Sequence, residues 1–479
     1  MKHLIPIFVL ALAFAASAAK PHVDGTSRSP NVLFIISDDL SKMALGCYGN
    51  EQCQTPNIDR LAREGMKFER AYCQFPVCGP SRAAMMSGMY AQSIGVTSNG
   101  KSELFTKNLG HRPTMSQHFI NHGYYAARVS KIYHMLIPGN ITEGVHGPDH
   151  AASWTERFSM HAPEWMSEGE HEHISGEKLR FDKDKHYRLG FGGAFYVVKG
   201  STDGSEQPDV MAADKAIELM RAHRKDPFFL AVGLVRPHVP LVAPKAYYDP
   251  YPVRKMKLAE KVPNDQADIP KAGLTGTSKQ RKITEPLKQR KCLSAYYASV
   301  TFMDAQVGRL LDELLELGLR KNTIVVFKSD HGWHLGEHDL WQKMSLHEES
   351  ASIPLIIAAP GKKPGVSHSL VEQIDLYPTL SELAGFEVPK HVQGRSLVKI
   401  LDDPTAKVRD AAYTLRSTSH LLRTDRWAYL QYPKKGGEEL YDMVNDPKQF
   451  TNLASDPKYA DTKARLKKHL ASKLAEITP

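Results

Sequence analysis

Two apolar runs that each end in metal-binding residue types constrain the fold of this chain more than any other feature. The first run covers residues 31–37 and is followed by Asp38 and Asp39. The second covers residues 322–329 and is followed by Asp330 and His331. A continuous apolar run bounded by turn residues is typical of a strand buried on both faces of a sheet. We therefore expect a covered sheet with polar residues at its strand ends.

Helical segments alternate with strands along the same part of the chain. Apolar residues recur at helical spacing over 295–317, shortly before the second run. Two more helix–strand pairs are predicted, at 114–121 with 123–128 and at 210–223 with 227–233. This alternation predicts an α/β fold with a large, mostly parallel sheet flanked by helices, in which ligands bind at the carboxyl ends of the strands. The polar residues that follow predicted strands are Asp38, Asp39, Lys131, His134, His238, Asp330 and His331.

The two ends of the chain are predicted to differ from this central part. A short positive region, an apolar run over 4–15 and a small-x-small pattern at 16–18 predict a signal peptide over 1–19. The apolar run is shorter than the ~18 to 20 residues that cross a bilayer, so we expect an exported, periplasmic or extracellular protein without a membrane anchor. Residues 30–400 are predicted to form the main α/β domain, with surface insertions at 149–208 and 251–290. Residues 401–479 are predicted to form a smaller C-terminal subdomain with an antiparallel sheet and a final helix.

Composition and charge exclude several classes of protein. With 42% apolar and 24% charged residues, a chain of 479 residues is neither disordered nor fibrous. Its 62 Lys and Arg against 53 Asp and Glu give a net charge of +9, which favours an anionic substrate. No block of about five or six like charges occurs, so no nucleic-acid partner is expected. The count of five cysteines is odd, so at least one thiol is free or has another use.

Cys78 is the candidate for that other use. Pro80 suits the first turn of a helix, which places Cys78 at a helix N-terminus, where an anion is stabilised. The alternative is a buried or disulfide-bonded cysteine. The aspartates and histidine at the strand ends suit a hard divalent cation such as calcium or magnesium, although strand-end aspartates also form caps and turns.

The motif Cys78-x-Pro80-x-Arg82, downstream of an Asp-Asp strand end, resembles the signature of type I sulfatases. Further blocks that resemble this family follow in order: Thr55-Pro-Asn-Ile-Asp59-Arg-Leu, Gly123-Tyr, Lys131-x-x-His134, Ser329-Asp330-His331-Gly332 and Leu440-Tyr-Asp-Met with Asn445-Asp-Pro. The iduronate-2-sulfatase-like branch is suggested by Arg236-Pro-His238-Val-Pro, Tyr296-Tyr-Ala-Ser-Val and residues 330–343. His331 stands where most sulfatases have Asn, which is a trait of that branch.

The resemblance implies an alkaline-phosphatase-like sulfatase fold and a sulfuric ester hydrolase. In this family a maturation enzyme converts the cysteine to Cα-formylglycine before folding. One hydroxyl of the hydrated aldehyde attacks sulfur, and the other, once deprotonated, expels sulfate. The residues implied as ligands of one calcium ion are Asp38, Asp39, modified Cys78, Asp330 and His331. The residues implied as catalytic are Cys78, Arg82, Lys131, His134, His238 and Lys343.

The family roles of these residues are implied one by one. Arg82 would hold the nucleophile's oxygen. Lys131 and His134 would reach the same pocket, with His134 as the base for elimination. His238 and Lys343 would contact the sulfate from the other side, with His238 as the acid for the leaving group.

The predicted partner is a sulfated oligosaccharide or polysaccharide. A 2-O-sulfated uronic acid is preferred because of the branch, and an algal galactan such as carrageenan competes with it. Two alternatives remain beside a saccharide sulfatase: a phosphoester or phosphonate hydrolase of the same superfamily, and an inactive polyanion-binding protein built on a sulfatase fold. The complete set of implied ligands, with Cys78 and Arg82 both present, argues against these two.

Overall fold

A computed structural model describes residues 29–175, 179–181, 188–189, 193–434 and 436–477. The predicted signal peptide at 1–19 lies outside these residues. Among the helices that the structure describes, we find none that is both long and apolar enough to cross a membrane.

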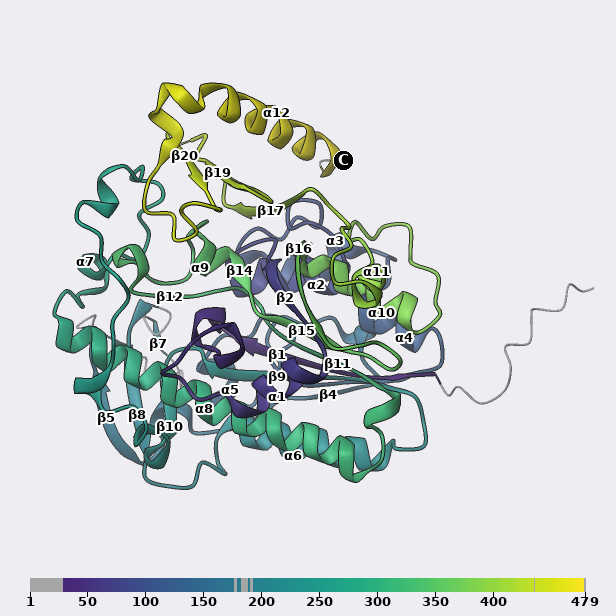
Figure 1. The fold of residues 1–479 in the computed structure, drawn as a ribbon. Helices are drawn as coiled ribbons and strands as arrows, with labels where there is room; N and C mark the ends of the chain where they lie inside the picture. The colour runs from purple at the N-terminus through teal and green to yellow at the C-terminus, as the bar shows by residue number, and fades with distance from the viewer. Residues whose placement is uncertain (1–28, 176–178, 182–187, 190–192, 435, 478–479) are drawn as a thin grey trace, which may run out of the picture.

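The strand β1 (Asn31–Asp38) lies inside the main sheet, which has nine strands in the described part of the chain (Figure 1). It runs parallel to both of its neighbours, β11 (Thr323–Ser329) and β9 (Phe228–Pro237). The other strands are β2 (Met66–Tyr72), β3 (Tyr125–Ser130), β4 (Glu156–Phe158), β14 (Ser352–Ile353), β15 (Leu355–Ala358) and β16 (Gly365–Glu372). Only β14 and β15 run against their neighbours, so the predicted mostly parallel sheet is confirmed.

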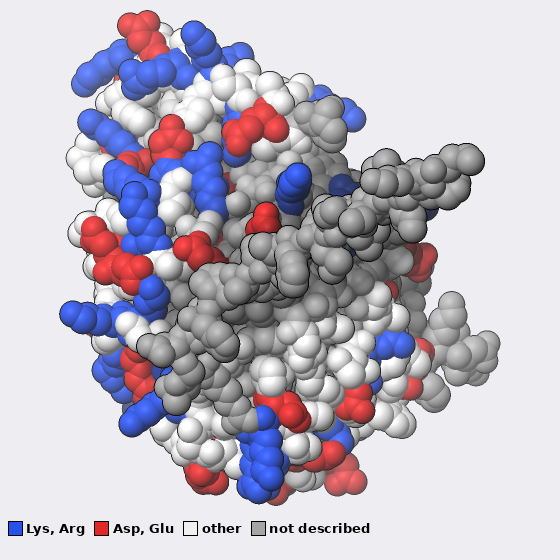
Figure 2. Space-filling model, turned by 90° about the vertical axis from the view of Figure 1, so that its right-hand side faces the viewer, with Lys and Arg blue, Asp and Glu red and all other residues white. Residues whose placement is uncertain are grey.

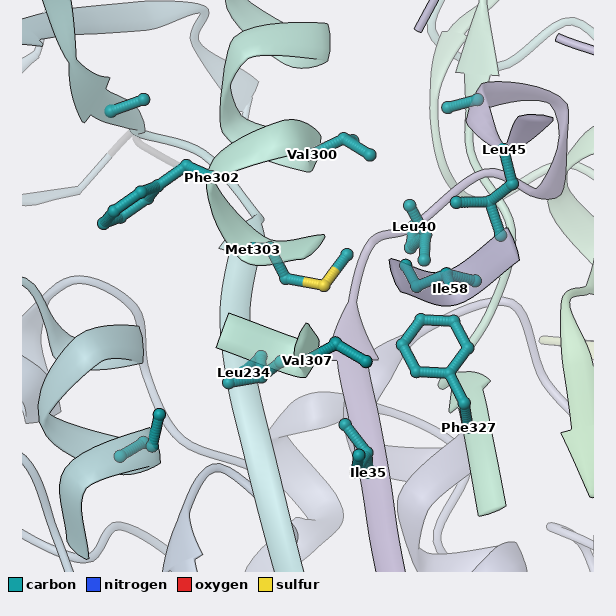
Figure 3. Packing of buried hydrophobic residues seen from close by; sticks show 14 of the residues in the cluster. Ile35, Leu40, Leu45, Ile58, Leu234, Val300, Phe302, Met303, Val307 and Phe327 are labelled. Atoms are coloured by element: carbon teal, nitrogen blue, oxygen red, sulfur yellow. The ribbon is translucent and has the colours of Figure 1, made fainter. Parts of the chain in front are cut away.

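Alternate residues of β1 enter two hydrophobic cores, one on each face of the sheet. Leu33 and Ile35 pack in the first core, under α1 (Pro56–Glu64), α6 (Pro208–Ala222) and α8 (Pro286–Glu316). Figure 3 shows Val300, Met303 and Val307 of α8 above this face of the sheet. The intervening residues of β1 enter the second core, under α2 (Cys78–Ser87), α4 (Met115–Ile120), α10 (Leu376–Leu383) and α11 (Val398–Asp402). Burial on both faces explains why the strand is apolar throughout.

Shorter elements connect these layers. The short helices are α3 (Phe105–Leu109), α5 (Gly139–Thr142), α7 (Ser278–Arg281) and α9 (Glu348–Ala351). The strands β5 (Gly169–His173), β8 (Tyr196–Gly200) and β10 (Leu241–Pro244) form a separate sheet, and β6 (Arg180–Phe181) with β7 (Arg188–Leu189) and β12 (His334–Leu335) with β13 (Trp341–Gln342) form two-stranded pairs.

The prediction that residues 149–208 form a surface insertion is wrong for part of this segment. Strand β4 pairs with β3 at the edge of the main sheet. The side chain of Glu164 is fully buried, where it forms an ion pair with the equally buried Arg236. This contact could not be predicted from the polar sequence, because Glu164 and Arg236 lie 72 residues apart along the chain.

The C-terminal strands form the predicted antiparallel sheet, and the final helix α12 (Ala460–Ile477) packs against it (Figure 1). Its strands are β17 (Ala411–Arg416), β18 (Ser419–Thr424), β19 (Trp427–Gln431) and β20 (Glu438–Asp442), of which β20 was not predicted. The sheet shares a hydrophobic cluster with Phe75 and Val77, directly before α2. The division into domains at residue 400 stays a prediction.

Lys and Arg side chains are interspersed with Asp and Glu on the coloured part of the face shown in Figure 2.

All five cysteines are free thiols, and four of them are buried. The disulfide alternative for Cys78 is therefore not observed.

Candidate active site

The parallel pairing of β1 with β11 brings the predicted acidic residues to one edge of the sheet. Ser37 lies opposite Ser329 in the register, so the residues that follow both strands leave the sheet side by side. The backbone N–H of Asp39 donates to Oδ1 of Asp330 over 3.2 Å. Asp39 has a φ of +63°, which turns the chain sharply after the strand.

Cys78 joins this group from the first position of α2. Its Sγ lies 3.3 Å from Nε2 of His331 and 3.8 Å from Oδ1 of Asp39. Potential ligand atoms of Asp38, Asp39, Cys78 and His331 all lie within 4.8 Å of one another, and all four residues are buried. This is the one such group of three or more metal-binding side chains among the residues that the structure describes. Asp330 lies against the group, at 3.6 Å from His331.

Two lysines and a histidine surround the carboxylates. Lys131 forms an ion pair with Oδ2 of Asp38. Nζ of Lys343 lies 2.6 Å from Oδ1 of Asp39 and 3.1 Å from Sγ of Cys78. Nε2 of His238 lies 3.6 Å from Oδ2 of Asp39. The structure thus brings these three predicted residues to the cysteine and the aspartates.

Arg82 contacts the carboxylates of Asp38 and Asp330. Its Nε donates to Oδ2 of Asp330 over 2.9 Å, and its Nη2 lies 3.3 Å from Oδ1 of Asp38. Its Nη1 donates to the backbone carbonyls of Lys131 and Ile132. The guanidinium is fully buried, and the described contacts do not include the sulfur of Cys78. Arg82 therefore orders two of the aspartates, and its predicted contact with the nucleophile's oxygen stays a prediction.

His134 lies near the group without joining its hydrogen bonds. Its Nδ1 is buried and has no hydrogen-bond partner among the described residues. Burial and the charge of Lys131 lower its pKa to about 3, so the imidazole is neutral. A neutral imidazole is the form that can accept a proton.

The pKa values of the two buried aspartates are shifted in opposite directions. Burial raises the pKa of Asp38, but Lys131, His238 and Arg82 outweigh it and hold that pKa well below its usual value. Burial raises the pKa of Asp39, because Lys343 offsets the burial only in part. Burial also raises the pKa of the Cys78 thiol well above its usual value. The charge of Asp39 is therefore less compensated by the protein than that of Asp38.

The residues fit a divalent cation. Oδ2 of Asp39 is buried and has no hydrogen-bond partner among the described residues. Nδ1 of His331 lies 3.0 Å from the carbonyl of Gly332, so its Nε2 is free to point a lone pair at Asp39 and Cys78. A buried carboxylate oxygen without a donor is stabilised by a cation. The carboxylate oxygens of this set favour a hard ion.

Sequence reasoning missed one residue that shapes the site. The hydroxyl of Tyr296, on α8, donates to the carbonyl of Asp39 over 2.7 Å and accepts from the N–H of Ser41 over 2.8 Å. These two bonds hold the turn in which Asp39 adopts its positive φ. In the sequence, Tyr296 was noted only as part of the block Tyr296-Tyr-Ala-Ser-Val, and no role was assigned to it.

A mostly parallel sheet that gathers two aspartates, a histidine and a helix-borne cysteine at its carboxyl edge defines a hydrolase of the alkaline-phosphatase-like class. The chain belongs to the sulfatase family, whose model matches residues 30–386. A second model, described as the C-terminal part of N-sulphoglucosamine sulphohydrolase, matches residues 336–476. The protein is thus a sulfuric ester hydrolase.

Individual relatives cover most of the chain. A sulfatase of Formosa agariphila is 32% identical over 456 residues, which are 92% of this chain and 86% of the relative. Iduronate 2-sulfatase of Homo sapiens is 32% identical over 430 residues, which are 80% of this chain and 74% of the relative. A 2-O GAG sulfatase of known structure has 25% identity and a TM-score of 0.72, with 94% of this chain and 93% of that chain covered.

Proposed function

We propose that the protein is an exported, calcium-dependent enzyme that removes sulfate from a sulfated saccharide through a formylglycine at position 78. The observation that carries this proposal is the position of Cys78, whose sulfur lies 3.3 Å from His331 and 3.1 Å from Lys343 in a buried group with Asp38 and Asp39. The proposed nucleophile, the proposed metal ligands and a cationic side chain therefore lie close enough together to contact one sulfate group.

Calcium, when bound, would screen the sulfate oxygens and lower the pKa of the attacking hydroxyl. Asp38, Asp39, Asp330 and His331 would hold it together with the modified residue 78. Arg82 keeps Asp38 and Asp330 in position, so its proposed role is to orient ligands.

The remaining residues would act on the ester. Lys343 faces both Asp39 and position 78, so its ammonium is placed to contact a nonbridging sulfate oxygen. Burial and Lys343 lower the pKa of His238 well below its usual value. A bound sulfate ester adds negative charge beside this ring and raises that pKa, which favours transfer of a proton to the leaving alcohol. Neutral His134 is the proposed base for the second hydroxyl of the formylglycine hydrate.

The similarity to iduronate 2-sulfatase and to a 2-O GAG sulfatase supports a 2-O-sulfated uronic acid as the first substrate to test. A sulfated algal galactan such as carrageenan is the second. The signal sequence supports export to the periplasm or beyond, after a formylglycine-generating enzyme has acted on Cys78.

The test is sulfate release by protein produced together with a formylglycine-generating enzyme. The substrates are 2-O-sulfated uronate disaccharides, 6-O-sulfated hexosamines, sulfated galactans and a phosphonate monoester. Release from a sulfated saccharide that disappears in Cys78→Ala supports the proposal. Turnover of the phosphonate alone, or sulfate release that survives Cys78→Ala, contradicts it.

A further inference from the structure

A cavity of about 560 Å³ lies beside the N-terminus of α2. Its walls come from the segment before Cys78, the segment Thr97–Asn99, Ala272, Met344 after Lys343, the turn Arg416–Ser419 between β17 and β18, and Lys434. This volume is in the range of small-molecule binding sites, roughly 300–1,000 Å³. The cavity is therefore large enough to hold more than a sulfate group.

The cavity adjoins the group around Cys78. Val77, which precedes Cys78, lines it, and so does Met344, which follows Lys343. Asn99 also lines it, and Oδ1 of Asn99 accepts the N–H of Gly79 over 2.9 Å. A ligand in the cavity thus contacts residues directly bonded to the proposed nucleophile and to the lysine that faces it.

The charged residues of this cavity are cations. Arg416 and Lys434 line it, and none of the described lining residues is acidic. Lys434 is exposed and forms no ion pair with a described carboxylate. Phe75 and Val77 add apolar surface to the lining. The cavity therefore suits a ligand with both a negative group and an apolar face, as a charged sugar ring has.

Arg416 is held in place by neutral groups alone. Its Nη1 donates to the carbonyl of Ala272 over 3.1 Å, and its Nη2 donates to Oγ1 of Thr275 over 2.8 Å. Its Nε is buried and has no hydrogen-bond partner among the described residues. Burial lowers the pKa of this guanidinium, and no carboxylate offsets the burial. A half-buried cation without a counter-charge is stabilised by an anionic ligand.

The strand that carries Arg416 is fixed to the segment before the nucleophile. The N–H of Leu415 donates to the carbonyl of Gln74 over 3.0 Å, and Oγ1 of Thr414 donates to the carbonyl of Cys73 over 2.6 Å. Ser417, in the following turn, has a φ of +56°. The guanidinium is thus positioned by main-chain contacts before any ligand arrives, which lowers the entropy cost of binding.

We propose that this cavity binds a sulfated sugar that carries a second anionic group, and that Arg416 is the residue that determines specificity for that group. The inference rests on the proposed sulfatase function, because the sulfate to be removed is placed at Cys78 and Lys343. The second group is a carboxylate or a further sulfate, both of which pair with a guanidinium.

The experiment compares Arg416→Gln with the native enzyme on four substrates. The first is a disaccharide with a 2-O-sulfated uronate and a 6-O-sulfated hexosamine. The second and third are its carboxyl-reduced derivative and its derivative without the 6-O-sulfate. The fourth is 4-nitrophenyl sulfate, which has no second anion. Arg426→Gln is the matched control, because Arg426 lies on the same subdomain but pairs with Asp442 outside the cavity.

We expect Arg416→Gln to lower kcat/KM for the complete disaccharide about 10- to 100-fold more than for 4-nitrophenyl sulfate, mainly through KM. Arg416→Lys should recover part of this loss, and Arg426→Gln should change neither substrate. The derivative on which the selective loss vanishes identifies the carboxylate or the second sulfate as the group bound. An equal loss on all four substrates, or no loss on any, would overturn the inference.

A second measurement separates this inference from the proposed function. Binding of the same disaccharide to Cys78→Ala by calorimetry needs no turnover. If the native enzyme released no sulfate, the proposed function would fail, while a weaker affinity of the Cys78→Ala, Arg416→Gln double variant would still support the binding site. Equal affinity of the single and double variants would refute it.

Discussion

Replacing Arg82 with methionine should destabilise the protein and abolish sulfate release together. The guanidinium of Arg82 is fully buried and faces Asp330 at 2.9 Å and Asp38 at 3.3 Å. Removing one partner of a buried ion pair costs about 3–5 kcal/mol. Lys131 still faces Asp38 in the variant, so most of the penalty falls on Asp330 and the lower part of this range is expected.

The expected shift in melting temperature follows from chain size. Unfolding entropy is about 2.1 cal/mol/K per residue, so for 479 residues it is roughly 1 kcal/mol/K, and the lower part of the range lowers Tm by about 3–4 °C. Arg82→Lys should lose about half of this, because one ammonium can face one carboxylate but cannot span both. Thermal unfolding followed by near-ultraviolet circular dichroism measures the shift, and sulfate release measures activity.

The matched control is Arg309→Met. Arg309 forms an ion pair with Asp214, and the two side chains are 40% and 57% exposed. Surface ion pairs contribute little, so no measurable change in Tm is expected. If Arg82→Met melted within 1 °C of the native protein while retaining its fold, the claim that Arg82 stabilises the buried aspartates would be refuted.

Three further predictions follow from the same geometry. Peptide mass spectrometry of active protein should show an aldehyde in place of the Cys78 thiol, and a fully active sample with only unmodified cysteine would contradict the mechanism. Removal of divalent cations should abolish sulfate release, calcium should restore it, and Asp39→Asn should lower it by orders of magnitude; unchanged turnover with a metal-free site would exclude the cation. Burial lowers the pKa of His338, but Asp265 and Glu349 outweigh it and raise that pKa to about 9. Because this value lies above that of an unfolded histidine, about 6.5, the ion pair should stabilise the fold fully below pH 6.5 and lose roughly 3 kcal/mol as pH rises through 9. Unfolding free energies of native protein and Asp265→Asn should converge over that window, and parallel curves would argue against the ion pair.

Local patterns in the sequence predicted four strands of the main sheet, β1, β3, β9 and β11, but not β2, β4, β14, β15 and β16. Residues 31–37 and 322–329 were predicted as strands, and the structure places β1 at Asn31–Asp38 and β11 at Thr323–Ser329. Strands buried on both faces have a composition that is visible without knowing their partners. Because parallel neighbours end at the same edge, the meeting of Asp38 and Asp39 with Asp330 and His331 could also be predicted.

Contacts set by distant loops could not be predicted in this way. Lys343 follows the β12–β13 pair and lies between Gln342 and Met344, which both have positive φ. No periodic pattern encodes such a turn, so its position came from family resemblance alone. The partners of Arg82 and the bonds of Tyr296 to Asp39 likewise depend on how whole elements pack.

The conversion of Cys78 proposed above has to precede the hydrogen bonds between β17 and the segment before Cys78. Cys78 is 1% exposed in the folded protein, and the strand that bonds to the segment before it is made later, at residues 411–416. The positions 78 and 411 are 333 residues apart. At a synthesis rate of about 5–20 residues per second, the chain spends roughly 15–65 s between making the cysteine and making this strand. A modifying enzyme that needs an open segment therefore competes with elongation, and slowing translation after residue 78 should raise the fraction of aldehyde-bearing protein.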